Sequence, residues 1–379
     1  MQGESGRPAE RLLRHVPELD GLRGLAALAV FFHHVCVSTV HTDVRWGPIT
    51  ELVRSASIYG NAGVDVFFVL SGFLITSTLL NGQTKPDYYA PFYWKRLLRI
   101  VPVYVCVLLY VVLSQPHSAF AVWCAVFFAA NLSLLAHVPP VPPFWSLAIE
   151  EQFYLVWPSL VHRRSPRVLL RWAACIALGT VLLRVVFALR GHYNYFLTFL
   201  HCDGLAAGAL LACLYVEGRR RSGAIRALLA GSWTAGLVAW LVGRELPGRM
   251  HEGVAMGAAV SLTAVTLLSL GLVGTLVFYT GSRWLGIFRG RVLVYFGLIS
   301  YCFYLVHLYV AIAYDGRWSL GATASEAAFW GRFAVILVGS VLVSTVSRYG
   351  LELPVQRLRR YIPVLQTRAA RAEQARVSP

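Results

Sequence analysis

Charged side chains are scarce in this sequence. Asp, Glu, Lys and Arg make up 14% of its 379 residues, and hydrophobic residues make up 57%. A soluble protein carries about a quarter charged residues, so an ordinary soluble domain is excluded. Several apolar runs are long enough to span a bilayer, which predicts an all-α polytopic membrane protein in the cell membrane. The net charge of +16 does not indicate nucleic-acid binding, because the arginines gather between the apolar runs, as the positive-inside rule requires.

Motifs for several common chemistries are also missing. The seven cysteines are scattered through apolar segments and form no Cys-x-x-Cys pair, so neither a disulfide framework nor a zinc site is indicated. The sequence has no P-loop, no Rossmann fingerprint and no Gly-x-Ser-x-Gly elbow. We therefore expect no metal. The first apolar run lacks a small-residue cleavage site and should remain as the first helix.

Eleven apolar runs and the arginines between them predict the topology. The positive-inside rule favours about ten crossings with both termini in the cytoplasm, so one of the runs 100–114 and 119–136 should not cross fully. We expect a polar lead at 1–16, one membrane domain at 17–347 and a basic cytoplasmic tail at 348–379. The tail should contact anionic lipid.

The first apolar run contains ionisable residues at membrane depth, where they are costly and often functional. Arg23 and His34 are eleven residues apart, which is about 1100° of helix, so both project from one face with a rise of about 16 Å. This geometry suits an anionic group held near the rim and proton chemistry deeper in the membrane. The simpler interpretation is a topology signal at Arg23 and hydrogen-bonded core histidines at His33 and His34.

Further polar residues interrupt the next apolar runs. Asp65 is expected to orient a histidine, or only to interact favourably with the dipole at a helix N-terminus. Ser71 is expected either to bind substrate or to allow close helix packing. Arg96 and Arg99 lie three residues apart, and two adjacent guanidinium groups suit a phosphorylated ligand from the cytosol. Their other interpretation is ordinary positive-inside charge. Glu150 lies in an apolar segment, where a carboxylate is a candidate acid, base or hydroxyl-orienting group.

A late helix carries hydroxyl groups and a histidine on one face. Ser300, Tyr304 and His307 are spaced by four and three residues, with Tyr301 beside them, which suits either a polar substrate or hydrogen bonds between helices. His201, Asp203 and Arg184 are candidates for internal pairs that neutralise charge inside the bundle. From the residues alone, the chain is either a transporter of an anion or an enzyme that uses a phosphorylated donor.

The sequence resembles the membrane-bound acyltransferase-3 family, the bacterial O-acyltransferases, over about residues 15–350. We expect the stand-alone form of this family, which has no appended hydrolase-like domain. Five blocks carry the resemblance in order: ELDGLRG…FFHH, DVFFVLSGFLI, KRLLRIVPVY, WSLAIEEQFY and SYCFYLVH. Arg23 and His34 occupy the family's Arg-x10-His pattern, and Glu150 occupies its acidic position. Where relatives often carry Arg two residues before an Asp, this chain has His201 before Asp203.

The resemblance implies transfer of a short acyl group from acyl-CoA, with acetyl-CoA as the expected donor. Arg96 and Arg99 would hold the CoA phosphates, and Arg23 would guide the donor. His34 would deprotonate the acceptor hydroxyl or carry the acyl group itself. The remaining candidates have supporting roles: Asp65 and Glu150 would orient acceptor and histidine, and Ser71, Ser300, Tyr301 and His307 would line the cavity.

The leading hypothesis is therefore an O-acyltransferase whose acceptor is an envelope glycan, a lipid-linked sugar or a macrolide-type metabolite. The alternative is a transporter or flippase that moves an anionic or acylated molecule with the same polar residues and without chemistry. Beyond donor and acceptor, we expect the lipid bilayer as the partner, and no nucleic acid.

Overall fold

The computed structural model describes most of the chain. All regular secondary structure in the described residues is helical. The expected lead up to residue 15 and the tail beyond residue 362 lie outside the description. The described ranges are 16–38, 46–85, 87–114, 116–191, 195–217, 223–246, 256–318 and 325–362.

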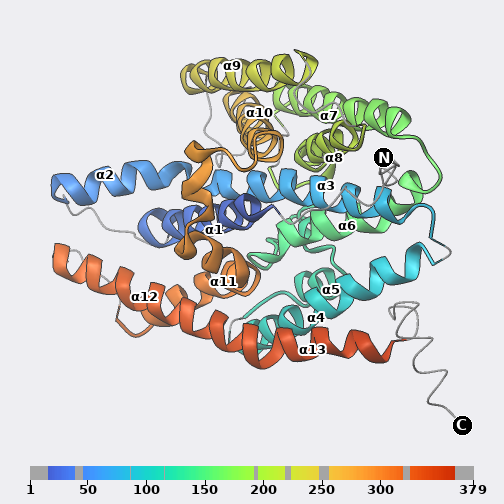
Figure 1. Cartoon of the computed structure of the whole chain (residues 1–379). Coiled ribbons are helices and arrows are strands. Elements are labelled where there is room, and N and C mark those ends of the chain that lie inside the picture. Colours follow the sequence, from blue (N-terminus) through green and yellow to red (C-terminus); the bar gives the residue numbers. More distant parts are fainter. Residues whose placement is uncertain are drawn as a thin grey trace, which may run out of the picture.

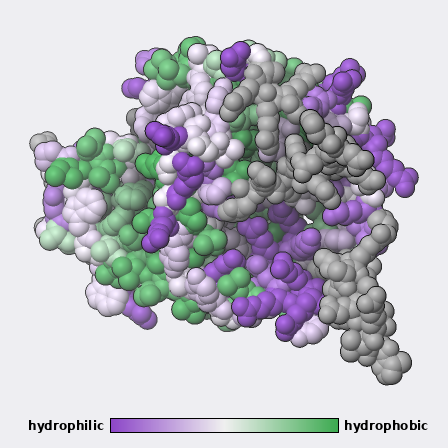
Figure 2. All heavy atoms as spheres, viewed as in Figure 1, coloured by the Kyte–Doolittle hydropathy of each residue, from purple (hydrophilic) through white to green (hydrophobic). Residues whose placement is uncertain are grey.

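Within these ranges, eight helical stretches have the length and apolar composition needed to cross a membrane. Apolar side chains of several outer helices point away from the bundle, as lipid contact requires, and the chain is a multi-pass membrane protein. Figure 2 shows such apolar side chains on the left, near α2 and α12, whereas hydrophilic ones gather at the lower right, where α4 begins and α13 ends. The eight stretches are Pro17–Val37, Pro48–Gly82, Tyr89–Ser114, Pro166–Leu189, Gly223–Glu245, Met256–Phe278, Arg291–Asp315 and Glu326–Tyr361.

These stretches correspond to named helices and short turns. α1 (Pro17–His33) continues into the π-helical turn η2 (His34–Ser38), and α2 (Pro48–Ser57) runs through η3 (Ile58–Ala62) into α3 (Gly63–Gly82). The others are α4 (Tyr89–Ser114), α7 (Pro166–Leu189), α9 (Gly223–Glu245), α10 (Met256–Phe278), α11 (Arg291–Asp315) and α12 (Glu326–Ser347). η6 (Arg283–Arg289) joins α10 to α11.

The expected ten crossings require two more helices to cross. α6 (Phe144–Val161) and α8 (Asp203–Val216) are the available ones, and η5 (Thr198–Leu200) precedes α8. The run at 119–136 is not one continuous helix, because it divides into α5 (Ala119–Val126) and η4 (Ala130–Ala136). An eight-residue helix is about 12 Å long, too short for a hydrocarbon core of about 30 Å. The run that does not cross as a helix is therefore 119–136, and 100–114 belongs to the long helix α4.

Two features of the chain differ from the sequence-based expectation. The helix α2 was not expected at all, because residues 48–57 are less apolar than their neighbours. Helical structure also continues past residue 347, where α12 ends, through η7 (Arg348–Glu352) and α13 (Leu353–Arg357) to η8 (Leu358–Tyr361).

Close packing of small residues builds the centre of the bundle. A Cβ atom on Gly24 of α1 would lie 2.0 Å from the carbonyl oxygen of Leu293, and one on Gly297 of α11 would lie 2.0 Å from that of Asp20. Only glycine permits this approach of α1 and α11. α3 and α8 approach each other in the same way through Gly72 and Gly208. In Figure 1, α1 and α3 lie in the middle of the bundle, while α9 and α12 lie at opposite edges.

Candidate active site

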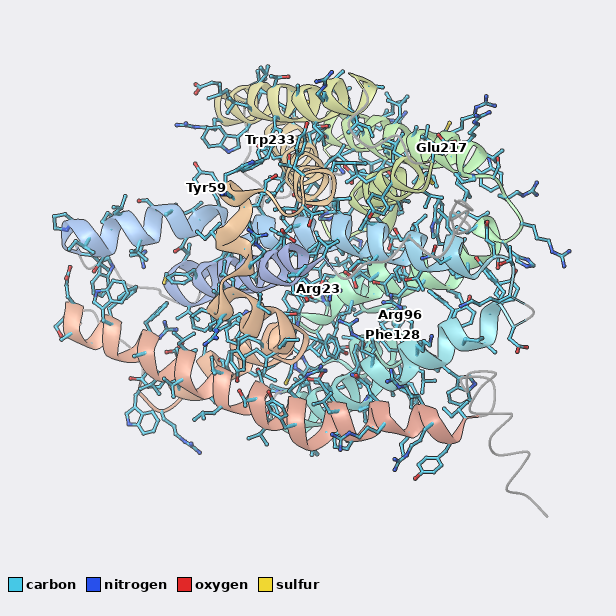
Figure 3. The ribbon with its side chains drawn as sticks, viewed as in Figure 1. Arg23, Tyr59, Arg96, Phe128, Glu217 and Trp233 are labelled. Atoms are coloured by element: carbon cyan, nitrogen blue, oxygen red, sulfur yellow. The ribbon has the colours of Figure 1, made fainter. Side chains whose placement is uncertain are left out.

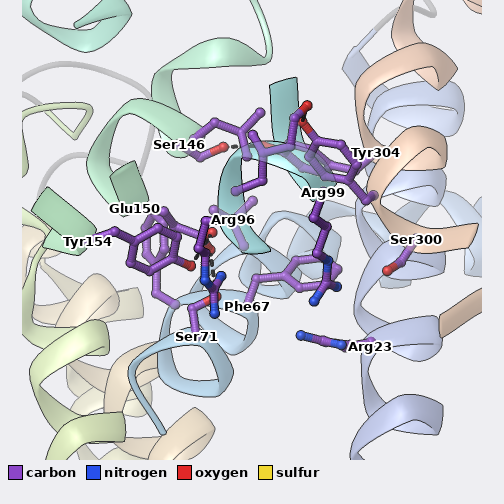
Figure 4. Close-up of a pocket in the computed structure, with 15 residues that line it drawn as sticks. Arg23, Phe67, Ser71, Arg96, Arg99, Ser146, Glu150, Tyr154, Ser300 and Tyr304 are labelled. Carbon is purple, nitrogen blue, oxygen red and sulfur yellow. Dashed lines mark hydrogen bonds between the residues drawn. The ribbon is translucent and has the colours of Figure 1, made fainter. Parts of the chain in front are cut away.

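Five helices surround a polar cavity inside the bundle. Its volume is about 90 Å³, and Figure 4 shows side chains from opposite walls pointing into it. Seven of the residues expected from the sequence line it: Arg23, Ser71, Arg96, Arg99, Glu150, Ser300 and Tyr301. The cavity therefore joins all five sequence blocks described above.

Three arginines converge on this cavity. Arg23 comes from the second turn of α1, and Arg96 and Arg99 share a face of α4 (Figures 3 and 4). The Arg96 guanidinium carbon lies 4.6 Å from the ring centre of Tyr154, a cation–π distance that fixes its orientation. Both arginines lie in the first half of α4, which begins at Tyr89.

The Glu150 carboxylate faces the arginines from α6. Its Oε1 atom accepts a hydrogen bond of 2.9 Å from the Ser71 hydroxyl, and its Oε2 atom accepts one of 2.9 Å from the Tyr154 hydroxyl. Two hydroxyl donors hold the carboxylate in one orientation. Ser71 and Glu150, which are 79 residues apart in sequence, thus form one polar unit between α3 and α6.

The opposite wall of the cavity belongs to α11. The Ser300 hydroxyl donates to the Gly297 carbonyl of its own helix at 2.9 Å, and the Tyr301 hydroxyl donates to the Ile100 carbonyl of α4 at 2.8 Å. The hydroxyl groups of Tyr304 and Ser146 lie 2.6 Å apart. Ser300 and Tyr301 therefore line the cavity as expected, while their own hydrogen bonds go to the backbone.

A pair of histidines lies next to this cavity. Nδ1 of His34 is 2.9 Å from Nε2 of His307, and Nδ1 of His307 is 3.0 Å from the carbonyl oxygen of Phe303. A carbonyl only accepts, so Nδ1 of His307 carries a proton, and in the neutral ring Nε2 is the acceptor. His34 then donates through Nδ1, and we assign to neutral His34 the tautomer with its lone pair on Nε2.

The histidine pair and the arginine cavity are adjacent but distinct. Neither His34 nor His307 is among the residues that line the cavity, so the expectation that His307 lines it is wrong. Tyr304 connects the two, because it lines the cavity and its ring centre lies 6.1 Å from that of His307. His33 points elsewhere: its Nδ1 lies 3.1 Å from the Ser57 carbonyl oxygen.

Asp65 lies on α3 between Val64 and Phe68, which line the cavity, but it does not line the cavity itself. It is completely buried and pairs with His201, whose Nε2 atom is 2.8 Å from Asp65 Oδ1. The expectation that Asp65 orients the histidine of the main site is therefore wrong, because α8 brings a different histidine to it. Beside this pair, Arg184 of α7 donates to Asp203 at 2.6 Å. Arg184 thus neutralises Asp203, one of the internal pairs that the sequence left open.

Two polar lining residues were not noted in the sequence: Ser146 and Tyr154. Both lie four residues from Glu150, one before it and one after it, and so share its helix face. Extending the Glu150 position by one helical turn in each direction would have found both. Tyr304, already noted on the polar face of the late helix with Ser300, also lines the cavity.

Other candidate sites among the described residues are less suited to binding and orienting a reacting molecule. A larger groove of about 700 Å³ between α4, α11 and α12 has mostly apolar walls and offers few groups to orient a reacting molecule. Within the described ranges, no group of three or more His, Cys, Asp and Glu residues is placed to hold a metal ion.

Comparison with known proteins agrees with the sequence blocks. The family model described as "Acyltransferase domain" (Acyl_transf_3) matches residues 16–349. The Staphylococcus aureus (strain COL) protein named "Putative O-acetyltransferase SACOL0978" is 26% identical over 350 residues, covering 82% of this chain and 53% of that protein. O-acetyltransferase OatA of Staphylococcus aureus (strain NCTC 8325 / PS 47) is 29% identical over 231 residues, covering 53% of this chain and 35% of OatA.

The chain spans about half the length of the first of these relatives. No solved structure matches it. The family match covers most of the chain and includes all five sequence blocks, the arginine-lined cavity and the histidine pair. The chain therefore belongs to the acyltransferase-3 family.

Proposed function

We propose that the protein is a membrane O-acyltransferase that moves a short acyl group, with acetyl as the first candidate, from acyl-CoA to a hydroxyl group. The observation that carries this proposal is the arrangement of three arginines around one cavity with an oriented histidine pair beside it. Family membership and the names of the relatives, both O-acetyltransferases, support the reaction class.

The arginines are suited to the phosphates of the donor. Arg23, Arg96 and Arg99 line the cavity together with a single carboxylate, that of Glu150, so the cavity has an excess of positive charge that attracts a polyanion. Guanidinium groups bind phosphate through paired hydrogen bonds. A cavity of about 90 Å³ does not hold a nucleotide, so the nucleotide end of CoA would lie outside it, with the arginines at the boundary.

The histidine pair is suited to general-base catalysis. Nε2 of His34 takes the proton of the acceptor hydroxyl, and the hydroxyl oxygen attacks the thioester carbonyl carbon. A carbon–oxygen bond forms, the carbon–sulfur bond breaks, and the departing CoA sulfur takes the proton from the His34 imidazolium. Nε2 of His307 accepts a hydrogen bond from the Nδ1–H group of His34 throughout and so keeps the tautomer that this step needs.

Arg23 and His34 then have different tasks on one helix. Arg23 lies at the donor end, and the residue spacing places His34 about 16 Å further along α1. A donor bound by its phosphates and extended toward His34 would bring its thioester to the histidine pair. Glu150, held by Ser71 and Tyr154, is available to bind a hydroxyl group of the acceptor.

The proposed acceptor is one of the three classes expected from the sequence: an envelope glycan, a lipid-linked sugar or a macrolide-type metabolite. The mass of the acylated product distinguishes these classes. A transporter would use the same arginines to hold an anion, but it would have no need for the His34–His307 tautomer. The histidine pair therefore favours chemistry over transport.

A direct assay tests the proposal. Purified protein in lipid nanodiscs is given acetyl-CoA with a radiolabelled acetyl group and candidate acceptors of each class. We expect label in an acceptor and loss of turnover in His34→Ala, by about 10²- to 10⁴-fold for a lost general base. Full turnover in His34→Ala would refute the catalytic role, and uptake of label into sealed vesicles without a new ester would favour transport.

A further inference from the structure

The helix that carries His34 changes its geometry at that residue. α1 is α-helical up to His33, and the π-helical turn η2 begins at His34. A π-helical turn is wider than an α-helical one and is frequently found at functional sites. The backbone carbonyls in such a turn depart from the regular α-helical pattern, and here two of them accept hydrogen bonds from arginines of other helices.

The first of these arginines is Arg332 of α12. Its Nη1 atom donates to the Val35 carbonyl at 2.7 Å, and Val35 directly follows His34. Its Nε and Nη2 atoms donate to the two carboxylate oxygens of Asp315 at 2.7 and 2.6 Å. Arg332 is only 1% exposed, and a buried guanidinium is costly unless a carboxylate compensates it, as Asp315 does.

The second arginine is Arg54 of α2. Its Nη1 atom donates to the Cys36 carbonyl at 2.8 Å. On the other side of His34, His33 is hydrogen-bonded to the Ser57 carbonyl. Groups from α2 and α12 therefore hold the chain on both sides of His34, through the side chain of His33 before it and through backbone carbonyls after it.

We propose that Arg332 is a positioning residue that, together with Asp315, sets the separation of His34 and His307. Asp315 ends α11 eight residues after His307, about 12 Å along the same helix. One guanidinium thus joins the helix that carries His307 to the turn that carries His34. This inference rests on the proposed function, because the separation matters for catalysis only if His34 is the base.

The main test compares variants of Arg332 in the full chain in nanodiscs, with acetyl-CoA as donor. Arg332→Met removes both the paired hydrogen bonds to the Asp315 carboxylate and the hydrogen bond to the Val35 carbonyl. We expect kcat to fall about 10- to 100-fold, because misplacing a catalytic group by about 1 Å has an effect of this size, while KM for acetyl-CoA stays the same. Arg332→Lys keeps the charge but not the planar set of guanidinium donors, so its kcat should lie between those of wild type and Arg332→Met.

A double-mutant cycle separates positioning from general stability. If Arg332 acts through His34, Arg332→Met has no further effect on the residual turnover of His34→Ala. If it only stabilises the fold, it reduces turnover by the same factor in both backgrounds, and the inference is wrong.

A matched variant at the other end of the same helix controls for helix anchoring. Glu18 is 1% exposed and anchors the start of α1 by accepting hydrogen bonds from Thr280 and from the Gly281 amide. We expect Glu18→Gln to lower the thermal unfolding temperature without lowering kcat per folded molecule. An equal loss of kcat in Glu18→Gln and Arg332→Met would overturn the positioning role.

A spectroscopic readout keeps this inference distinct from the proposed function. In protein labelled with ¹⁵N-histidine, the Nδ1–H of His34 bonded to His307 gives a signal that is lost in His34→Ala. We expect Arg332→Met to shift or broaden this signal, and an unchanged signal would refute the positioning role whatever the activity is. Conversely, if Arg332→Met shifts the signal but His34→Ala retains full turnover, only the catalytic role of His34 is refuted.

Discussion

Nε2 of His307 lies 2.9 Å from Nδ1 of His34, and Nδ1 of His307 lies 3.0 Å from the carbonyl of Phe303 in its own helix. The carbonyl fixes the proton of His307, and His307 in turn fixes the proton of His34. A backbone atom of α11 thereby determines which nitrogen of the α1 histidine carries the lone pair. This chain of two hydrogen bonds makes a clear prediction for His307.

Replacing His307 with Ala should lower kcat more than replacing it with Gln. The Gln side chain retains an oxygen that can accept the Nδ1 proton of His34, whereas Ala leaves that donor without this acceptor. A lost neutral hydrogen bond of about 1 kcal/mol corresponds to about fivefold, and an unsatisfied buried donor adds to this. Steady-state rates with acetyl-CoA measure the effect.

His33→Gln is the matched control for His307. His33 bonds to the Ser57 carbonyl and has no part in the proposed reaction. We expect its replacement to reduce thermal stability and to leave kcat unchanged. Equal rates in His307→Ala and His307→Gln would show that His307 does not set the tautomer.

Replacing both Arg96 and Arg99 with Ala should weaken the binding of CoA. Hydrogen bonds to charged groups contribute about 1.5–3 kcal/mol each, so we expect each arginine to account for about a 10- to 100-fold change in affinity. Calorimetry with CoA measures it. Arg167→Ala is the control, because Arg167 is exposed and forms an ion pair with Glu217, and an unchanged affinity in the double variant would refute the donor site.

The sequence predicted the members of the cavity better than their contacts. Arg23, Arg96, Arg99 and Glu150 could be chosen because ionisable residues within apolar helices are unusual, and all four line the cavity. Periodicity also placed Arg23 and His34 on one face of α1. It gives the direction of a side chain around its own helix, but it does not say which other helix will lie opposite.

The two histidine contacts show this limit. His34 has His307 as its partner, and Asp65 has His201. The sequence was equally compatible with a pair of Asp65 and His34. The choice depends on which helices pack side by side, and that depends on glycine contacts such as those of Gly24 and Gly297. A single sequence shows these glycines but not their partners.

Replacing Glu150 with Gln should affect the acceptor more than the donor. Ser71 and Tyr154 donate to different carboxylate oxygens, and in Gln one of these positions becomes an amide nitrogen that cannot accept, so one of the two hydrogen bonds is lost. We expect KM for the acceptor to rise about tenfold or more, since a hydrogen bond to a charged group contributes about 1.5–3 kcal/mol, and KM for acetyl-CoA to change less. Ser71→Ala removes one neutral donor and should have the same effect to a smaller extent. A change confined to KM for acetyl-CoA would contradict the acceptor role.

Breaking the ion pair between Arg184 and Asp203 should destabilise the fold without acting on the reaction. Both side chains are almost completely buried, and Nη2 of Arg184 lies 2.6 Å from Oδ1 of Asp203. Removing one partner of a buried pair costs about 3–5 kcal/mol, because the other charge remains buried. We expect Asp203→Asn to lower the unfolding temperature in detergent clearly.

The ion pair of Arg167 and Glu217 provides the comparison for that prediction. The Arg167 side chain is 80% exposed and that of Glu217 is 15% exposed, so water screens this pair more than the buried one, and Glu217→Gln should lower the unfolding temperature less than Asp203→Asn does. Removing both buried charges, with Arg184→Met and Asp203→Leu together, should recover much of the loss from Asp203→Asn, since an apolar pair of similar size avoids the cost of burying charge. If the double variant is no more stable than the single one, the buried pair has a further role, and the Asp65–His201 pair beside it is where that role would lie.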